Sequence, residues 1–165
     1  MICFLGIGSN IDDRLSNLNQ SITLISEDVN INFLKVSNFY ESPPMYNLNL
    51  NMFLNGVIKI STSYAPHQLL RKVKNIESKM GREKCTERYE NRIIDIDILC
   101  CGNEIIESDE LIVPHPNIKE RKFVLEPWCD IDSNYIIANE NRKIEELLAM
   151  LPESLKLKRV NWMSL

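Results

Sequence analysis

The sequence is short of the residues from which several common catalytic sites are built. It has only two histidines, His67 and His115, and its five cysteines form no C-x-x-C pair. This argues against a zinc site, and it gives no support to a Ser-His-Asp triad. The absence of a G-x-x-x-x-G-K-[ST] loop excludes a P-loop enzyme. Because the cysteine count is odd and Cys100 and Cys101 are adjacent, we expect reduced, buried thiols in a cytoplasmic protein.

An excess of basic charge and long apolar runs are also missing. The formal net charge is −4, which disfavours a general nucleic-acid binder or a protein of anionic membranes. The first ten residues, "MICFLGIGSN", carry neither a charged start nor a long apolar run. We therefore expect no signal peptide and no membrane span. The 165 residues are 44% hydrophobic, enough for one core, and we expect one domain over residues 1–165 that acts as a monomer.

What the sequence does contain is an alternation of strand and helix patterns. The patterns predict strands over residues 2–8, 31–42, 52–63 and 93–101, and helices over residues 12–27, 66–80, 118–125 and 144–151. We interpret Gly6 to Gly8 as the turn that ends the first strand, and Asp12 as the cap of the first helix. The order predicts an α+β, ferredoxin-like β-α-β-β-α-β core with an extra strand and helices at the C-terminal end. In that layout both core helices cover one sheet face, and the other face is free for a site.

Two acids interrupt an apolar strand pattern in "NRIIDIDILCCGN", residues 91–103. Aspartate is disfavoured in strands because its short side chain competes for backbone hydrogen bonds. Side chains alternate along a strand, so Asp95 and Asp97 share one face, with Cα atoms about 6–7 Å apart. Two carboxylates this close repel each other unless a cation bridges them, and Mg²⁺ takes one or two carboxylates together with phosphate oxygens. Two solvated acids on an exposed face are the alternative.

The segment before these acids is rich in basic side chains. Arg82, Lys84, Arg88 and Arg92 lie within one polar stretch without apolar periodicity, which predicts a loop that we expect to be mobile. Such a loop is commonly a solvated surface. Beside a carboxylate–metal pair, however, arginine forks would bind the phosphate chain of a nucleotide from the other side. The functional interpretation is therefore a polyphosphate substrate.

These residues belong to a set of motifs that resembles one enzyme family. The stretch "RYENRIIDIDIL" is similar to the signature of the 6-hydroxymethyl-7,8-dihydropterin pyrophosphokinases, R-x-[small]-x-R-x-x-D-[aliphatic]-D-[aliphatic]-[aliphatic]. The stretches "GIGSN", "SNFYESPP", "FLNGV", "IESKMGR", "CGNEIIESDELIVPHP" and "ERKFVLEPW" fall in the order and spacing of the same family. The resemblance covers about residues 2–138, and the combination of motifs is far more specific than any one of them.

The resemblance implies transfer of the β,γ-pyrophosphoryl group of ATP to 6-hydroxymethyl-7,8-dihydropterin, with release of AMP, in folate biosynthesis. ATP would be the co-substrate and two Mg²⁺ ions the cofactors, bound by Asp95 and Asp97. Arg82 and Arg92 would be catalytic beside them. The implied pterin site comprises Ser42, Pro43, Met45, Phe53, Asn55 and Phe123. The implied ATP site comprises Glu77, Arg82, Lys84, Arg88, Tyr89, Arg92, Ile98, His115 and Arg121.

The sequence departs from the family's pattern just before the second arginine of the signature. Glu90 and Asn91 stand where the family usually has a small residue followed by Pro, Ser or Ala, and Tyr89 stands where Trp is frequent. Pro116, after His115, replaces a position that is often aromatic. These departures bear on the closure of the loop and on a nucleotide contact rather than on the type of reaction.

Two other functions stay open on the residues alone. A different two-metal enzyme of similar fold, such as a nucleotide cyclase or phosphodiesterase, would share the acid pair but has no use for a pterin pocket. An RNA-binding module of this fold would need exposed aromatic and basic side chains on the free sheet face, where this chain has Asp95 and Asp97.

Overall fold

Strand β1 lies between β5 and β4 in an antiparallel sheet whose order is β5-β1-β4-β3-β8, with β2 also paired to β4. The computed structural model describes residues 1–45, 49–82, 90–154 and 156–160. The elements are β1 (Ile2–Ser9), α1 (Arg14–Ser26), β2 (Ile31–Val36), β3 (Phe39–Ser42), β4 (Phe53–Thr62), α2 (Pro66–Lys79), β5 (Asp95–Cys101), β6 (Ile106–Glu107), β7 (Ile112–Val113), the 3₁₀ turn η1 (Ile118–Glu120), α3 (Lys122–Asp132), α4 (Ile144–Ala149) and β8 (Lys158–Val160). This confirms the predicted α+β, ferredoxin-like order.

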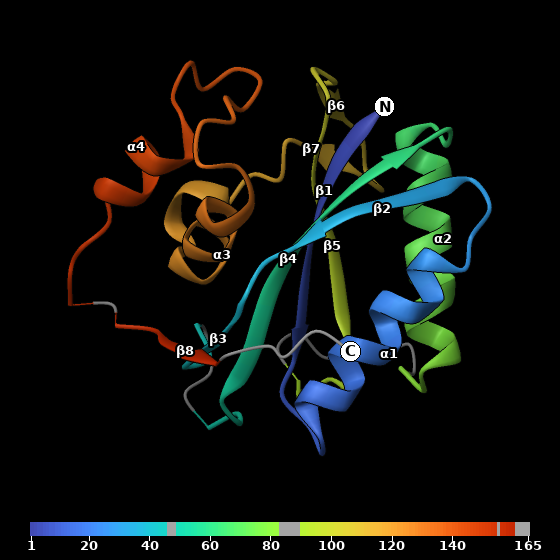
Figure 1. The fold of residues 1–165 in the computed structure, drawn as a ribbon, viewed down its shortest axis with the longest axis horizontal. Coiled ribbons are helices and arrows are strands. Elements are labelled where there is room, and N and C mark those ends of the chain that lie inside the picture. Colours follow the sequence, from blue (N-terminus) through green and yellow to red (C-terminus); the bar gives the residue numbers. More distant parts are fainter. Residues whose placement is uncertain (46–48, 83–89, 155, 161–165) are drawn as a thin grey trace.

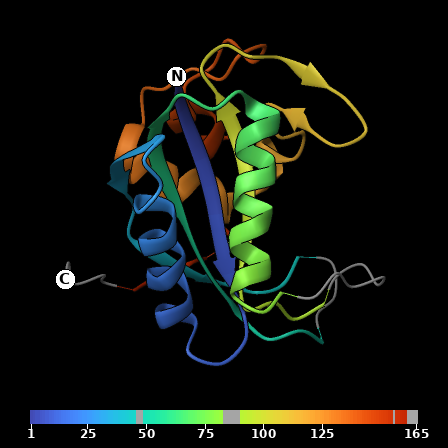
Figure 2. The ribbon, with the colours of Figure 1, turned by 90° about the vertical axis from the view of Figure 1, so that its right-hand side faces the viewer.

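Helices α1 and α2 cover the same face of the main sheet, as the sequence predicted (Figures 1 and 2). Leu69, Val73 and Ile76 of α2 recur at helical spacing, and all three are buried. They pack in one core cluster with Ile94 and Ile96. The isoleucines around the two aspartates therefore do face the core, so the acids point away from it.

Local contacts explain where the observed elements differ from the predicted ones. The predicted strand over residues 31–42 is divided into β2 and β3 at Ser37, where the Val57 N–H donates to the side-chain Oγ at 2.9 Å while the Ser37 N–H donates to the Val57 carbonyl at 3.0 Å. Asp13, not Asp12, caps α1, and its carboxylate accepts the Ser16 N–H at 3.0 Å. Gly81, with φ of +91°, follows the end of α2 in the left-handed conformation that ends many helices.

The second sheet face is not as free as the sequence predicted. Helix α3 packs across β4 and β3 there, and it lies on the side of the sheet opposite α1 and α2 (Figure 1). The predicted short helix over residues 118–125 is divided into two pieces and is too short at its end, since η1 covers Ile118–Glu120 and α3 begins at Lys122 and runs through Pro127. Beyond the proline, Trp128 is fully buried, with its ring 4.6 Å from that of Phe4. We attribute the helix's continuation to this packing, which offsets the hydrogen bond that proline cannot donate.

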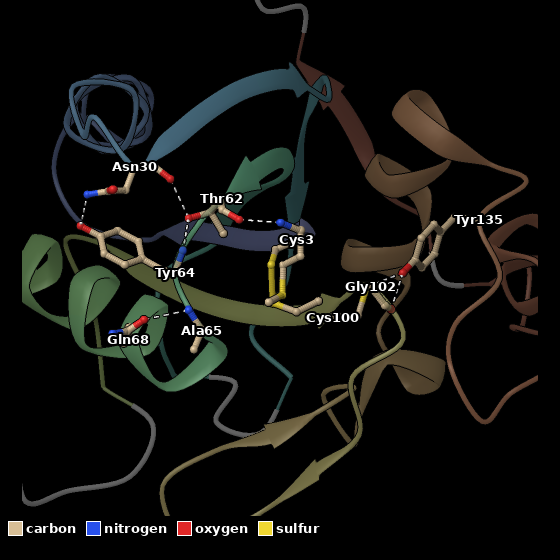
Figure 3. The surroundings of a disulfide bond; sticks show 11 residues. Cys3, Asn30, Thr62, Tyr64, Ala65, Gln68, Cys100, Gly102 and Tyr135 are labelled. Carbon is tan, nitrogen blue, oxygen red and sulfur yellow. Dashed lines mark hydrogen bonds between the residues drawn. A yellow bond between two sulfur atoms is a disulfide. The ribbon is translucent and has the colours of Figure 1, made fainter.

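The cysteines were predicted to be reduced thiols, and for one pair this was wrong. Cys3 and Cys101 are joined by a disulfide between β1 and β5 (Figure 3). The antiparallel register places these two residues opposite each other, with Cα atoms 4.1 Å apart, and both are fully buried. Cys100 is a buried free thiol. Nearby, the Tyr135 hydroxyl donates to the Gly102 carbonyl at 3.0 Å, as Figure 3 shows. Among the described residues, no helix is both long and apolar enough to cross a bilayer.

Candidate active site

A cavity of about 250 Å³ occupies the part of the second sheet face that α3 leaves uncovered. Its floor comes from β1, β4 and β5, and its walls come from the segment after β3 and from the first turn of α3. The lining side chains of interest are Ser42, Pro43, Met45, Phe53, Asn55, Arg92, Asp95, Asp97, His115, Arg121 and Phe123. The cavity therefore joins an apolar, aromatic end to a strongly charged end.

The floor of the cavity depends on glycines within β1. We interpreted "GIG" as a turn that ends the strand, but Gly6, Ile7 and Gly8 all lie inside β1 and pair with β4 and β5. A Cβ built on Gly8 would lie 2.8 Å from Oδ1 of Asn55, closer than such atoms approach. Asn55 is buried and its Nδ2 donates to Ser42 Oγ at 2.9 Å. The missing side chain at Gly8 thus leaves Asn55 room to lie over the floor.

Asp95 is held between two arginines at the charged end. Its Oδ1 lies 2.6 Å from NH1 of Arg82, and its Oδ2 lies 2.7 Å from NH1 of Arg92. Burial alone would raise the pKa of the Asp95 carboxyl, but the charges of Arg92 and Arg82 outweigh it and hold the pKa below its usual range. The carboxylate is therefore ionised at neutral pH and offers oxygen ligands to a cation.

Asp97 faces a second cationic group across the cavity. Its Oδ2 lies 3.2 Å from NH1 of Arg121 and 3.9 Å from Nε2 of His115. Burial lowers the pKa of His115, so the ring is neutral at pH 7. Its Nδ1 accepts the Asn117 N–H at 3.2 Å, which places the ring proton on Nε2, toward the cavity. This end thus presents a neutral donor and a guanidinium to an anionic ligand.

Glu77 lies beneath the charged end rather than in the cavity wall. It is 3% exposed, and its Oε1 lies 2.6 Å from NH1 of Arg82 and accepts the Ile96 N–H at 2.7 Å. Burial raises the pKa of the Glu77 carboxyl, against the lowering effect of Lys74 and Arg82. In this arrangement Glu77 supports Arg82 from behind, and the place in the nucleotide pocket that the resemblance implied for Glu77 stays a prediction.

The structure brings most of the predicted site residues together. All six residues of the implied pterin site line the cavity, as do Arg92, Asp95, Asp97, His115 and Arg121 of the charged set. Arg82 contacts the charged end of the cavity through its ion pair with Asp95. Ile98 is packed in the core on the other side of β5. Lys84, Arg88 and Tyr89 lie outside the described residues.

Sequence reasoning missed several residues around the cavity. Gly8 and Leu99 line the floor, and Glu90, noted only as a departure from the family pattern, lines the charged end. Asn10 is 1% exposed and its Oδ1 accepts the Arg92 N–H at 2.6 Å. The glycines at alternate positions of β1 were the available signal, because two residues without side chains on one strand face leave a hollow there.

The charged end has features that fit a bound polyphosphate and its cation. Arg121 Nε is buried, and no described residue accepts its hydrogen, so a bound anion would satisfy that donor. Within the described ranges, no group of three or more His, Cys, Asp or Glu side chains is placed to hold a metal. Two carboxylates fit Mg²⁺, since this ion usually takes one or two carboxylates and completes its shell with water and phosphate oxygens.

Comparison with known proteins gives one consistent result at the level of sequence. The family model described as 7,8-dihydro-6-hydroxymethylpterin-pyrophosphokinase (HPPK) matches residues 4–133. A 2-amino-4-hydroxy-6-hydroxymethyldihydropteridine pyrophosphokinase of Bacillus subtilis is 39% identical over 130 residues, which covers 79% of this chain and 77% of that protein. A protein of the same name from Haemophilus influenzae is 32% identical over 155 residues, which covers 94% of this chain and 96% of that protein. The "Folic acid synthesis protein fol1" of Schizosaccharomyces pombe is 36% identical over 151 residues, 92% of this chain but only 20% of that much longer protein.

Solved structures show the same fold. The HPPK-DHPS of Plasmodium falciparum with pteroate matches 90% of this chain and 42% of that chain, with a TM-score of 0.72 and 17% identity. An HPPK-DHPS in complex with substrates matches with a TM-score of 0.69 and 16% identity. The match covers 90% of this chain and 43% of that chain. This chain thus spans less than half of these longer proteins, and the likeness shows the fold of the matched part.

Proposed function

Because the chain belongs to the 7,8-dihydro-6-hydroxymethylpterin-pyrophosphokinase (HPPK) family, we propose that it transfers the β,γ-pyrophosphoryl group of ATP to 6-hydroxymethyl-7,8-dihydropterin. AMP is the second product, and the reaction belongs to folate biosynthesis. The observation that carries this proposal is one cavity that joins Phe53, Asn55 and Phe123 to Asp95 and Asp97. A flat heteroaromatic acceptor and a polyphosphate donor can meet only where both kinds of side chain share one space.

The aromatic end suits a pterin. Phe53 and Phe123 both line the cavity and can contact the two faces of a planar ring. Asn55 has an amide for the donor and acceptor edge of the pterin, and its Nδ2 is already oriented by Ser42. The hydroxymethyl group of a ring bound in this way would point along the floor toward β5, where the acids lie.

The charged end suits the phosphates of ATP. Arg92, Arg121 and the Nε2–H of His115 supply donors, and Asp95 and Asp97 fit two Mg²⁺ ions. Bound there, the ions would neutralise negative charge on the phosphate oxygens. Arg82 and Arg92 stabilise the charge that develops on the transferred group, and the cavity walls orient the hydroxyl for attack on the β-phosphorus. Phosphoryl transfer relies mainly on positioning and electrostatics, so no strong general base is required.

Because the side chains of one chain are sufficient to form both the aromatic and the charged end of the cavity, we propose that the monomer is the active form. Size-exclusion chromatography coupled to light scattering, at the concentration used for turnover, tests this directly. A dimer that loses activity when diluted into monomers would contradict it.

The test of the function is AMP formation from ATP. We expect AMP to appear only when both 6-hydroxymethyl-7,8-dihydropterin and Mg²⁺ are added, in equal amount to the pterin pyrophosphate formed. A nucleotide cyclase would instead give cyclic AMP without pterin, and a phosphodiesterase would consume a cyclic nucleotide. ATP turnover that does not depend on the pterin would overturn the proposal.

Phe123→Ala is expected to weaken pterin binding by about 1–3 kcal/mol, through lost stacking and burial. ATP affinity should stay within about threefold, because Phe123 lies at the aromatic end of the cavity. Calorimetric titration of each ligand measures both values. An equal loss for both ligands would show that the side chain maintains the packing of α3 rather than a pterin contact.

Gly8→Ala is expected to weaken pterin binding by about tenfold, because its new Cβ would displace Asn55 from a distance of 2.8 Å. Gly6→Ala is the matched comparison, since its Cβ would meet only the Leu99 side chain at 3.4 Å. We expect a smaller loss there. Pterin titration of both variants, with melting temperatures alongside, measures the difference, and equal effects would remove the role assigned to Asn55.

A further inference from the structure

Asn91 occupies a junction between three segments of the chain. Its Oδ1 lies 2.7 Å from Nδ2 of Asn10 and accepts the Asn51 N–H at 3.2 Å. Asn10 directly follows β1, Asn51 precedes β4, and Asn91 precedes β5. One side-chain oxygen therefore connects segments that are far apart in the sequence.

The orientation of both amides is fixed by backbone donors. The Asn51 N–H can only donate, so the Asn91 atom that faces it is the oxygen. Likewise the Arg92 N–H donates to Oδ1 of Asn10 at 2.6 Å, which leaves the Asn10 NH₂ group to face Asn91. Asn10 is 1% exposed and its own N–H donates to the Arg92 carbonyl at 3.1 Å. In these contacts Asn91 acts only as an acceptor.

The connected segments carry the two ends of the cavity. Arg92, next to Asn91, lines the charged end and pairs with Asp95. Asn51 is followed closely by Phe53, which lines the aromatic end. We propose that Asn91 is a positioning residue that holds Arg92 and the pterin-lining segment before β4 in one fixed relation. This inference rests on the proposed function, and it assigns a role to a position where the family usually has a residue without an amide.

The acceptor-only role makes the inference testable with a matched pair of variants. Asn91→Ala removes the oxygen, while Asn91→Asp keeps an acceptor of the same shape at an exposed position. We expect Asn91→Ala to raise the KM for the pterin about tenfold and to lower kcat about tenfold, with the ATP dissociation constant within about threefold. Asn91→Asp should stay within about threefold of the wild type in both parameters. Asn103→Ala, in the exposed turn after β5, is the control and should match the wild type.

Two measurements separate this inference from the proposed function. Wild-type AMP formation is measured first, and its failure would overturn the proposed function itself. Hydrogen exchange at the Asn51 and Arg92 amides of the ligand-free protein tests the contact without any substrate, and it should accelerate in Asn91→Ala but not in Asn91→Asp. Unchanged exchange in Asn91→Ala, or an Asn91→Asp variant as impaired in turnover as Asn91→Ala, overturns the inference.

Discussion

Asp95→Asn and Asp97→Asn are each expected to lower kcat for pterin-dependent AMP formation by about a thousandfold or more. Asparagine keeps the shape of the side chain but removes the negative charge that a cation requires. Both acids lie on the cavity side of β5, away from the isoleucine core, so we expect the fold to persist. Single-turnover kinetics in saturating ATP and Mg²⁺ measures the loss.

The control for this pair is Asp109→Asn, an exposed acid in the turn between β6 and β7. It makes the same chemical change outside the cavity lining, and wild-type turnover is expected. Circular dichroism and thermal melting show whether each variant is folded. If a folded Asp95→Asn or Asp97→Asn variant keeps more than about a tenth of the wild-type kcat, the proposed cation ligands are wrong.

Arg82→Ala and Arg92→Ala are expected to lower kcat by about a hundredfold, and to weaken ATP binding by less than about tenfold. The reason is that the attraction between these guanidinium groups and the phosphate oxygens is strongest when negative charge develops on the transferred phosphoryl group. In the structure both groups are already held within 2.7 Å of Asp95, and Glu77 supports Arg82 from below.

Separate measurements of the ATP dissociation constant and of the single-turnover rate distinguish transition-state stabilisation by these arginines from a role in ATP affinity. Arg142→Ala is the matched control, because this arginine is exposed in the segment before α4. Both of its values should equal those of the wild type. A large rise in the ATP dissociation constant with an unchanged kcat would assign Arg82 and Arg92 to ground-state binding instead.

The strand that carries the acids was the part of the site most open to prediction from sequence. Alternation along β5 places Asp95 and Asp97 on one side and Ile96 and Ile98 on the other, and the structure confirms both placements. This works because the pattern is local: two neighbouring residues of a strand face opposite ways in any sheet. Helix α2 was predicted to within one residue for the same reason, since its buried positions repeat at 3.6-residue spacing.

The predictions that were wrong concern features that depend on which strands become neighbours. Cys3 and Cys101 could not be paired in advance, because only the register of β1 against β5 sets them opposite each other. The interpretation of Gly8 as a turn residue was wrong. Glycine is required there because the Asn55 side chain, which belongs to another strand, occupies the space of a Cβ. The path of α3 across the second face was missed because it depends on the packing of Trp128 in the second core cluster, which the short helix pattern over residues 118–125 does not show.

The position of β1 between β4 and β5 determines how much of the chain must be synthesised before the cavity can form. Gly8 pairs with Asn55 on one side and with Asp95 on the other, and Phe123 closes the cavity from α3. A nascent chain that has emerged only as far as β4 can pair its first strand but carries neither acid. Contacts between distant parts of a chain also form late, because the entropy of closing the loop must be overcome first. Translation therefore has to pass Phe123 before the growing chain has a complete cavity, and amino-terminal fragments that end earlier lack part of it.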